Sequence, residues 1–210
     1  MRLGITIAPI PGRTASLARM AEDLGFDSIR IPDSQNLAPE VWGQLMLASQ
    51  TTSSIELGPG VTNSVTRDAA VTASAALALQ VESKGRAVCG IGRGDSAVQR
   101  IGLREDKVDS FERYLETLQT YLSGDTVERN GFASRIEWLP AMKVEKVPVE
   151  VTATGAKVIA AGARRADRIA LAVGADPEHM KWAMETARAA ADAADGRRGR
   201  RASALTSTAS

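Results

Sequence analysis

Short apolar runs alternate along this chain with longer stretches in which apolar residues return every three or four positions. The runs cover residues 3–8, 28–31, 55–57, 87–91, 147–153 and 168–173. Short apolar runs bounded by glycine, proline and polar residues are typical of buried strands, and the longer spacing is typical of helices. The pattern therefore predicts strands that alternate with helices.

The first helical stretch shows the spacing clearly. Leu17, Met20, Ala21 and Leu24 form an i, i+3, i+4, i+7 stripe that ends at Gly25, a common residue just past a helix. Similar stretches cover residues 39–48, 69–82, 111–122, 157–166 and 177–194. Successive strand–helix units imply parallel strands with right-handed crossovers. Two α/β architectures fit, a doubly wound open sheet and a (βα)8 barrel of TIM type that lacks some units.

A glycine-rich turn at residues 90–97, GIGRGDSA, follows the strand-like run 87–89. A strand that leads into such a turn and then into a helix leaves backbone N–H groups unpaired at the positive end of the helix dipole, where phosphate groups bind. The competing interpretation is a tight turn without a ligand. The segment matches neither a Walker loop nor the GxGxxG dinucleotide fingerprint.

Polar and small residues follow the predicted strands, at the edge where parallel α/β proteins bind their ligands. Asp33 follows the second strand, Gly58 and Gly60 flank a proline after the third, and Gly155 follows the fifth. The glycines predict a bulge or a strained turn. Asp33 fits a functional carboxylate, but also a helix cap or the partner of an arginine. The small residues leave room for a planar cofactor whose phosphate is held by residues 92–97.

Composition narrows the function classes. The 210 residues are 44% hydrophobic, which allows a sizeable core, and the formal charge of +1 provides no global field that favours nucleic acid or a membrane. The aromatic content of 4% argues against stacked nucleic-acid recognition. Cys89 is the only cysteine and His179 the only histidine, so we expect no disulfide framework, no metal site and no Ser-His-Asp catalysis. Cys89 is expected in the core and His179 at the surface.

The ends of the chain and one long connection set further expectations. The chain starts with a strand pattern rather than a signal peptide, and no apolar run approaches the roughly 18 residues of a membrane span, which predicts a cytoplasmic protein. Residues 125–146 are predicted to pack over one end of the sheet, as a cover for a site or as a plain hairpin. Residues 1–195 are predicted to form one domain, and the basic and then Ser/Thr/Ala-rich residues 196–210 a disordered tail.

Three motifs resemble the bacterial luciferase-like superfamily, in particular its coenzyme F420-dependent branch, which includes the methylenetetrahydromethanopterin reductases. They are residues 24–28 (LGFDS), 57–67 (LGPGVTNSVTR) and 90–97 (GIGRGDSA), and weaker similarity continues to about residue 195. Members of this family are (βα)8 barrels that use F420 or a flavin such as FMN. The resemblance implies an oxidoreductase that transfers a hydride between F420, or alternatively FMN, and a small organic substrate, and it implies a homodimer.

The resemblance also implies roles for individual residues. Asp33 would be the catalytic acidic residue near the reactive face of the cofactor ring. Gly60 and Val61 would form the family's bulge behind the ring, often with a non-prolyl cis peptide. Residues 94–97 would cradle the cofactor phosphate. The implied cofactor-binding residues are Gly60, Val61, Thr62, Asn63, Gly92, Gly94, Asp95, Ser96, Ala97 and Gly155.

The chain departs from the family pattern in three places. Ser34 stands where several F420-dependent relatives carry histidine, and Arg93 stands where the reductases carry proline, which adds a candidate phosphate contact. The match stops near residue 195, so we expect about six βα units of a truncated barrel that usually needs about 250 residues. The alternative function is a catalytically silent fragment that acts only through association or cofactor binding. A third hypothesis for the function is an α/β protein of another class that binds a phosphate-bearing ligand.

Overall fold

A curved parallel sheet forms the centre of the computed structural model, which describes the backbone of residues 2–207 and the side chains of residues 2–194. One ladder consists of β1 (Gly4–Thr6), β2 (Ser28–Ile31) and β3 (Glu56–Pro59). The second consists of β4 (Thr62–Asn63), β5 (Cys89–Gly92), β8 (Val149–Ala153) and β9 (Arg168–Leu171). A parallel bridge between Leu57 and Ala87 joins the two ladders.

The order of these parallel strands decides between the two predicted architectures. Within the described residues the order follows the chain without a reversal, whereas a doubly wound sheet reverses direction at its switch point. The sheet therefore winds in one direction, as the wall of a (βα) barrel does. The predicted barrel type, with about six βα units, is confirmed.

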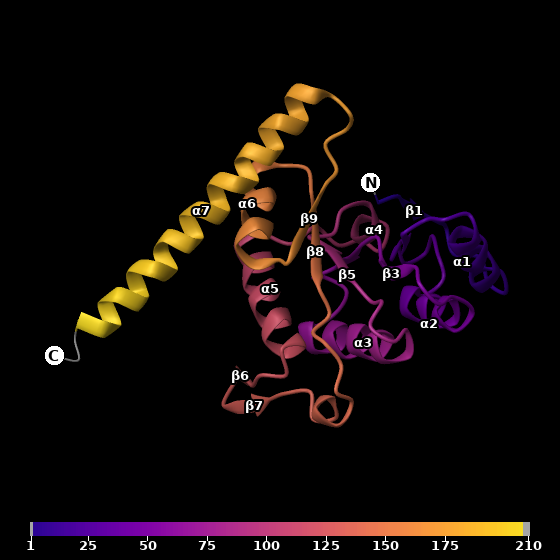
Figure 1. Cartoon of the computed structure of the whole chain (residues 1–210), viewed down its shortest axis with the longest axis horizontal. Helices are drawn as coiled ribbons and strands as arrows, with labels where there is room; N and C mark the ends of the chain where they lie inside the picture. Colours follow the sequence, from indigo (N-terminus) through magenta and orange to yellow (C-terminus); the bar gives the residue numbers. More distant parts are fainter. Residues whose placement is uncertain (1, 208–210) are drawn as a thin grey trace.

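Helices surround the sheet (Figure 1). They are α1 (Thr14–Asp23), α2 (Val41–Thr51), α3 (Ala69–Glu82), α4 (Ser96–Gln99), α5 (Val108–Leu122), α6 (Ala156–Arg165) and α7 (Pro177–Ser207). Helix α6 packs on β8 and β9, and α5 lies between α3 and α6. Helix α7 packs across α6 and then continues away from the body of the molecule.

The predicted elements differ from the observed ones mainly at their ends. The predicted strand 28–31 and helix 69–82 coincide with β2 and α3. The predicted strand 3–8 is reduced to β1, and the third predicted strand is extended and split into β3 and β4. Helix α7 continues through residues 196–207, where the sequence predicts a disordered tail, and residues 208–210 lie outside the described residues. The division into a domain of residues 1–195 and a tail stays a prediction.

The sheet has an apolar face toward the helices and a polar face toward the inside of the curve. Along β8, buried Val149 and Val151 alternate with half-buried Glu150, and on β2 the half-buried Arg30 lies between buried isoleucines. Cys89 is fully buried, which raises the pKa of its thiol to about 12, so the prediction of a core residue is confirmed. The largest fully buried side chains are Tyr121, Phe111, Ile29, Ile31, Leu45, Ile55, Leu57, Leu77, Leu79, Ile91, Leu115 and Leu118.

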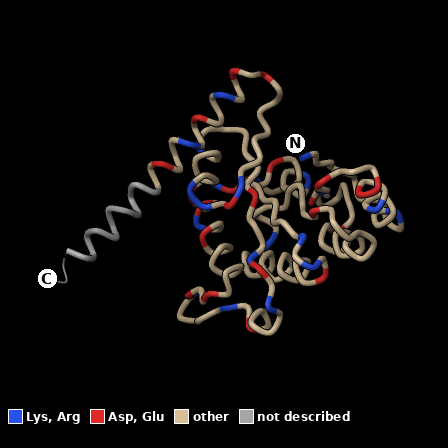
Figure 2. The backbone as a smooth tube through the Cα atoms, in the orientation of Figure 1, with Lys and Arg blue, Asp and Glu red and all other residues tan. Residues whose placement is uncertain are grey.

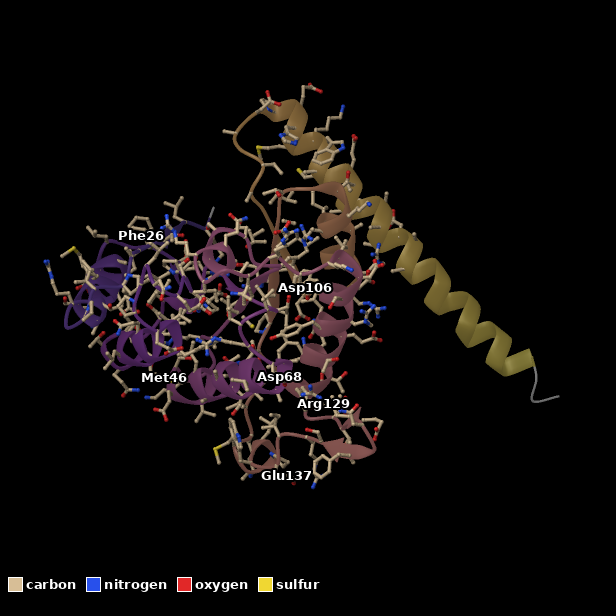
Figure 3. The ribbon with its side chains drawn as sticks, turned by 180° about the vertical axis from the view of Figure 1, so that it is seen from behind. Phe26, Met46, Asp68, Asp106, Arg129 and Glu137 are labelled. Atoms are coloured by element: carbon tan, nitrogen blue, oxygen red, sulfur yellow. The ribbon has the colours of Figure 1, made fainter. Side chains whose placement is uncertain are left out.

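The long connection at residues 125–146 forms a hairpin of β6 (Val127–Arg129) and β7 (Phe132–Ser134), followed by the 3₁₀ turn η1 (Leu139–Ala141). Arg129 forms two hydrogen bonds of 2.7 Å with Asp68 at the start of α3, and the two side chains lie next to each other in Figure 3. The hydroxyl of Tyr121 on α5 donates to Ser134 over 2.8 Å. These contacts fasten the hairpin to α3 and α5.

Charged residues of both signs lie along α5 and α6 (Figure 2). Arg164 and Arg165 of α6 both bond to Glu112 of α5, over 2.6 and 3.1 Å. The two helices are thereby joined by paired charges. Among the described helices, we find none with a stretch that is both sufficiently long and sufficiently apolar to pass through a membrane.

Candidate functional site

A cavity of about 430 Å³ lies at the carboxyl ends of the parallel strands. Its walls come from β4, from the last residues of β5 and β8, from the segments that follow β2, β3, β5, β8 and β9, from α4 with its following loop, and from α6. The lining residues are Pro32, Ser34, Gly60, Val61, Thr62, Asn63, Gly92, Arg93, Gly94, Asp95, Ser96, Ala97, Gln99, Glu105, Thr152, Ala153, Thr154, Val158 and Ala172. This is the edge of the sheet at which barrel proteins bind ligands.

The cavity brings together most of the residues predicted from the sequence. All predicted cofactor-binding residues line it except Gly155, which lies next to the lining residue Thr154. Asp33, predicted to be catalytic, is not among the lining residues either, although its neighbours Pro32 and Ser34 are. Sequence reasoning missed Gln99 and Glu105, because nothing in the sequence shows how far the short helix α4 and its following loop turn back toward the sheet. No residue of the hairpin connection lines the cavity.

A second depression, of about 500 Å³, lies between the C-terminal ends of α5 and α6 and the middle of α7, at residues such as Gln119, Arg164 and Asp167. It is away from the carboxyl ends of the strands, and both of its arginines are paired with Glu112. The cavity at the strand ends is therefore the better candidate site.

The third strand position contains the predicted bulge. The peptide bond between Gly60 and Val61 is cis, and it separates β3, which pairs with β2, from β4, which pairs with β5. The backbones come unusually close here: a Cβ atom on Gly60 would lie 2.5 Å from the Cβ of Arg30, and one on Gly90 would collide with the carbonyl oxygen of Pro59. Both positions therefore require glycine.

Asp33 is held by three donors beside the cavity. Its carboxylate accepts hydrogen bonds from Thr62 Oγ1 at 2.7 Å, Gln35 Nε2 at 2.6 Å and Arg67 Nε at 3.3 Å, and the residue is only 3% exposed. Arg67 also bonds to Glu40 over 2.7 Å. The predicted alternative, a carboxylate that pairs with an arginine, describes this geometry. Through Thr62, Asp33 orients a side chain in the cavity wall; its catalytic role stays a prediction.

Asn63 provides a hydrogen-bond donor that no residue in the described part of the chain uses. Its Oδ1 accepts from the backbone N–H groups of Val65 and Thr66 at 3.0 and 2.9 Å, which fixes the orientation of the amide. The other amide atom, Nδ2, is buried and has no partner, and Asn63 is 2% exposed in the cavity wall. A buried donor without an acceptor is costly, so the site fits a ligand that offers a carbonyl or ring acceptor.

The predicted phosphate cradle is built differently from the sequence expectation. Helix α4 has only four residues, so its dipole is small, and the Asp95 carboxylate already accepts the N–H of Ser96. Arg93 supplies a positive charge instead. Its Nη1 donates to the carbonyl of Asp106 over 2.6 Å, and among the described side chains it forms no salt bridge. Asp106, near the centre of Figure 3, is itself fixed by the hydroxyl of Ser64 at 2.9 Å.

The fold and the site together define a (βα) barrel protein with a polar cavity at its strand ends. The model of the luciferase-like monooxygenase family matches residues 4–209, so the chain belongs to this family, as its motifs predict. It is 33% identical over 164 residues to the 5,10-methylenetetrahydromethanopterin reductase of Methanolobus tindarius, covering 76% of this chain and 50% of that protein. It is 37% identical over 146 residues to the Methanopyrus kandleri protein of the same name, covering 61% of this chain and 42% of that protein.

Solved structures show the same architecture. The coenzyme F420-dependent tetrahydromethanopterin reductase of Methanopyrus kandleri superposes with a TM-score of 0.77 and 27% identity over 92% of this chain and 62% of that chain. The oxygenating constituent of 3,6-diketocamphane monooxygenase of Pseudomonas putida, in complex with FMN, has a TM-score of 0.75 over 92% of this chain and 63% of that chain; at 18% identity this shows the fold alone. The chain spans about half the length of the curated relatives it matches.

The close backbone contact beneath the bulge gives a first prediction. Gly90→Ala places a Cβ against the Pro59 carbonyl, and we expect it to lower the free energy of unfolding by about 1–3 kcal/mol. The control is Gly43→Ala in α2, where the added Cβ meets only the flexible end of Glu40 at 3.3 Å. Urea unfolding of the two variants measures the difference. Equal stability of the Gly90 and Gly43 variants would contradict the tight contact.

Proposed function

We propose that this chain binds F420, or alternatively FMN, in the cavity at its strand ends, and that it serves hydride transfer between the cofactor and a small organic substrate. The observation that carries the proposal is the convergence of three features on one cavity: the Gly60–Val61 bulge, and the Asn63 donor and the Arg93 charge, neither of which has a partner among the described side chains. A flat ring with carbonyl acceptors and a phosphate-bearing tail satisfies all three features. F420 is favoured because residues 57–67 resemble the F420-dependent branch, and an F420-dependent reductase is a 27% identical neighbour.

Such a cofactor supplies the hydride chemistry, so the protein needs no side-chain nucleophile. The chain's own residues bind and orient. Gly60 and Val61 leave a flat backbone surface against which a ring can lie, Asn63 Nδ2 donates to a ring acceptor, and Thr62 is kept in place by Asp33. Arg93 holds the negative charge of the tail. Ser34 is the hydroxyl on the wall next to Asp33, so a proton transfer assigned to this position would use Ser34 or water rather than histidine.

Titration of the purified protein with F420 and with FMN tests the proposal. We expect binding of at least one at micromolar concentration, and we expect Asn63→Asp to weaken it by at least about tenfold, because this change keeps the acceptor for Val65 and Thr66 but replaces the donor with a negative oxygen. Asn36→Asp, the same change at an exposed position outside the cavity wall, is the control. Failure to bind either cofactor would refute the proposal. Binding without turnover of reduced cofactor would favour the silent alternative.

The role of Arg93 is tested by comparing FMN with riboflavin, which lacks the phosphate. Arg93→Met is expected to lower the affinity for FMN about tenfold and to leave the affinity for riboflavin unchanged, because only FMN carries the phosphate that loses its partner. Arg104→Met, which changes an exposed arginine in the loop after α4 and outside the cavity wall, is expected to change neither affinity. Equal weakening of FMN and riboflavin by Arg93→Met would remove the phosphate assignment.

We also infer that the protein acts in the cytoplasm as a homodimer. Helices α2 and α3 carry only one charged residue between them, Glu82, and expose Leu47 and Val71, at 52% and 53%. Uncharged neighbouring helices with exposed apolar side chains are typical of surfaces that become buried on association. Sedimentation velocity is expected to give a dimer that Leu47→Glu dissociates. A wild-type monomer at micromolar concentration would contradict this.

A further inference from the structure

Four charged side chains meet on the inner, polar face of the curved sheet. Arg30 of β2 bonds to Glu56 of β3 over 2.8 Å and to Glu150 of β8 over 3.1 Å. Arg168 of β9 bonds to Glu56 over 2.7 Å, and the largely exposed Arg2 lies 3.9 Å from the same carboxylate at the edge of the group. The side chains of Arg30, Glu56 and Glu150 are between 14 and 18% exposed, and that of Arg168 is 39% exposed. We call these residues the inner quartet.

The inner quartet joins strands that are not neighbours in the sheet. Strand β2 pairs with β3, and β8 pairs with β5 and β9, so the contact between Arg30 and Glu150 crosses the inside of the curve. Burial would raise the pKa of Glu56, but hydrogen bonds from Arg168 and Arg30 outweigh it and lower the pKa. Glu56 is therefore charged near neutral pH, and the network holds as an ionic one.

The stem of Arg30 also lies directly beneath the bulge. A Cβ atom on Gly60 would come within 2.5 Å of the Arg30 Cβ, and the N–H of Gly60 donates to the carbonyl of Ile31 over 2.8 Å. On the other side, Glu150 precedes Thr152, which lines the opposite wall of the cavity. The same ionic contact thus connects the two walls between which a ring would lie.

We propose that Arg30 is a positioning residue for the cofactor cavity: held by Glu56 and Glu150, it fixes the Gly60–Val61 bulge beneath the ring and sets the distance to the β8 wall. The expected effect on cofactor affinity rests on the proposed function. The expected effect on the bulge does not depend on it. Arg30 touches no substrate or cofactor in this account. It acts through the backbone of Gly60.

The test uses a double variant that leaves no charge without a partner. Arg30→Met with Glu150→Gln keeps an unbranched stem beneath Gly60 and removes the pair, while Glu56 retains Arg168. The control, Arg164→Met with Glu112→Gln, removes a comparably half-buried pair between α5 and α6, while Arg165 retains Glu116. Circular dichroism and thermal unfolding establish that both variants fold.

Amide hydrogen exchange of the segment 58–64 is the first measurement. We expect exchange there to rise by about tenfold in the Arg30/Glu150 variant and to stay within twofold of wild type in the control. Unchanged exchange in the first variant overturns the proposal. An equal rise in both variants overturns it too, because the quartet then contributes only general stability.

Cofactor affinity is the second measurement. The Arg30/Glu150 variant is expected to bind FMN and riboflavin, or F420, about tenfold more weakly. The reason is that the backbone beneath the ring becomes more mobile, while the phosphate contact is unchanged. Increased exchange with unchanged affinity overturns the positioning role. If the wild-type protein binds neither cofactor, the proposed function fails, and the exchange measurement still decides whether Arg30 fixes the bulge.

Discussion

The close approach of two backbones at Gly90 and Pro59 is the constraint on which the candidate site depends. No side chain fits between them, so β3 lies almost against β5 and the chain must change its pairing partner within a few residues. The change occurs at the cis peptide of Gly60 and Val61. Gly60, Val61, Thr62 and Asn63, which follow this close contact, all line the cavity. In our proposal this part of the wall is where a flat cofactor ring lies.

The polar groups around this surface divide into groups that hold the wall and groups that stay free. Asp33 accepts a hydrogen bond from Thr62 in the cavity wall, and Asp106 accepts one from Ser64 in the loop behind it. Among the described residues, Asn63 Nδ2 has no acceptor. Arg93 donates to a backbone carbonyl but pairs with no carboxylate of the described part of the chain. The buried Asp33 and the half-buried Asp106 hold the wall in place, and we propose that the remaining donors favour a ligand with acceptor atoms and negative charge. On the inner face of the sheet, Arg30 extends the same rigidity from the bulge to the far wall.

Much of this could be predicted from the sequence because it follows from local chemistry. Gly58 and Gly60 around a proline indicate a bulge at any strand end, and the alanine-rich residues 69–82 can only form a helix. The full set of hydrogen bonds to Asp33 could not be predicted: Gln35 is a near neighbour in sequence, but Thr62 and Arg67 come from a distant segment that only the fold brings together with it. The shortness of α4 could not be predicted either. Asp95 and Ser96 are typical residues at the start of a helix, but α4 ends at Gln99 and Gly102 then adopts a left-handed conformation, so the helix has only a small dipole.

The central claim is that the carboxyl ends of these strands form one cavity for a flat, phosphate-bearing redox cofactor. A crystal structure of the protein in complex with F420 or FMN is the strongest test of this placement. We expect a ring that lies against the Gly60–Val61 peptide, with an acceptor atom within hydrogen-bond distance of Asn63 Nδ2 and the phosphate near Arg93. A cofactor bound elsewhere on the molecule, or a ring directed away from the bulge, would contradict it.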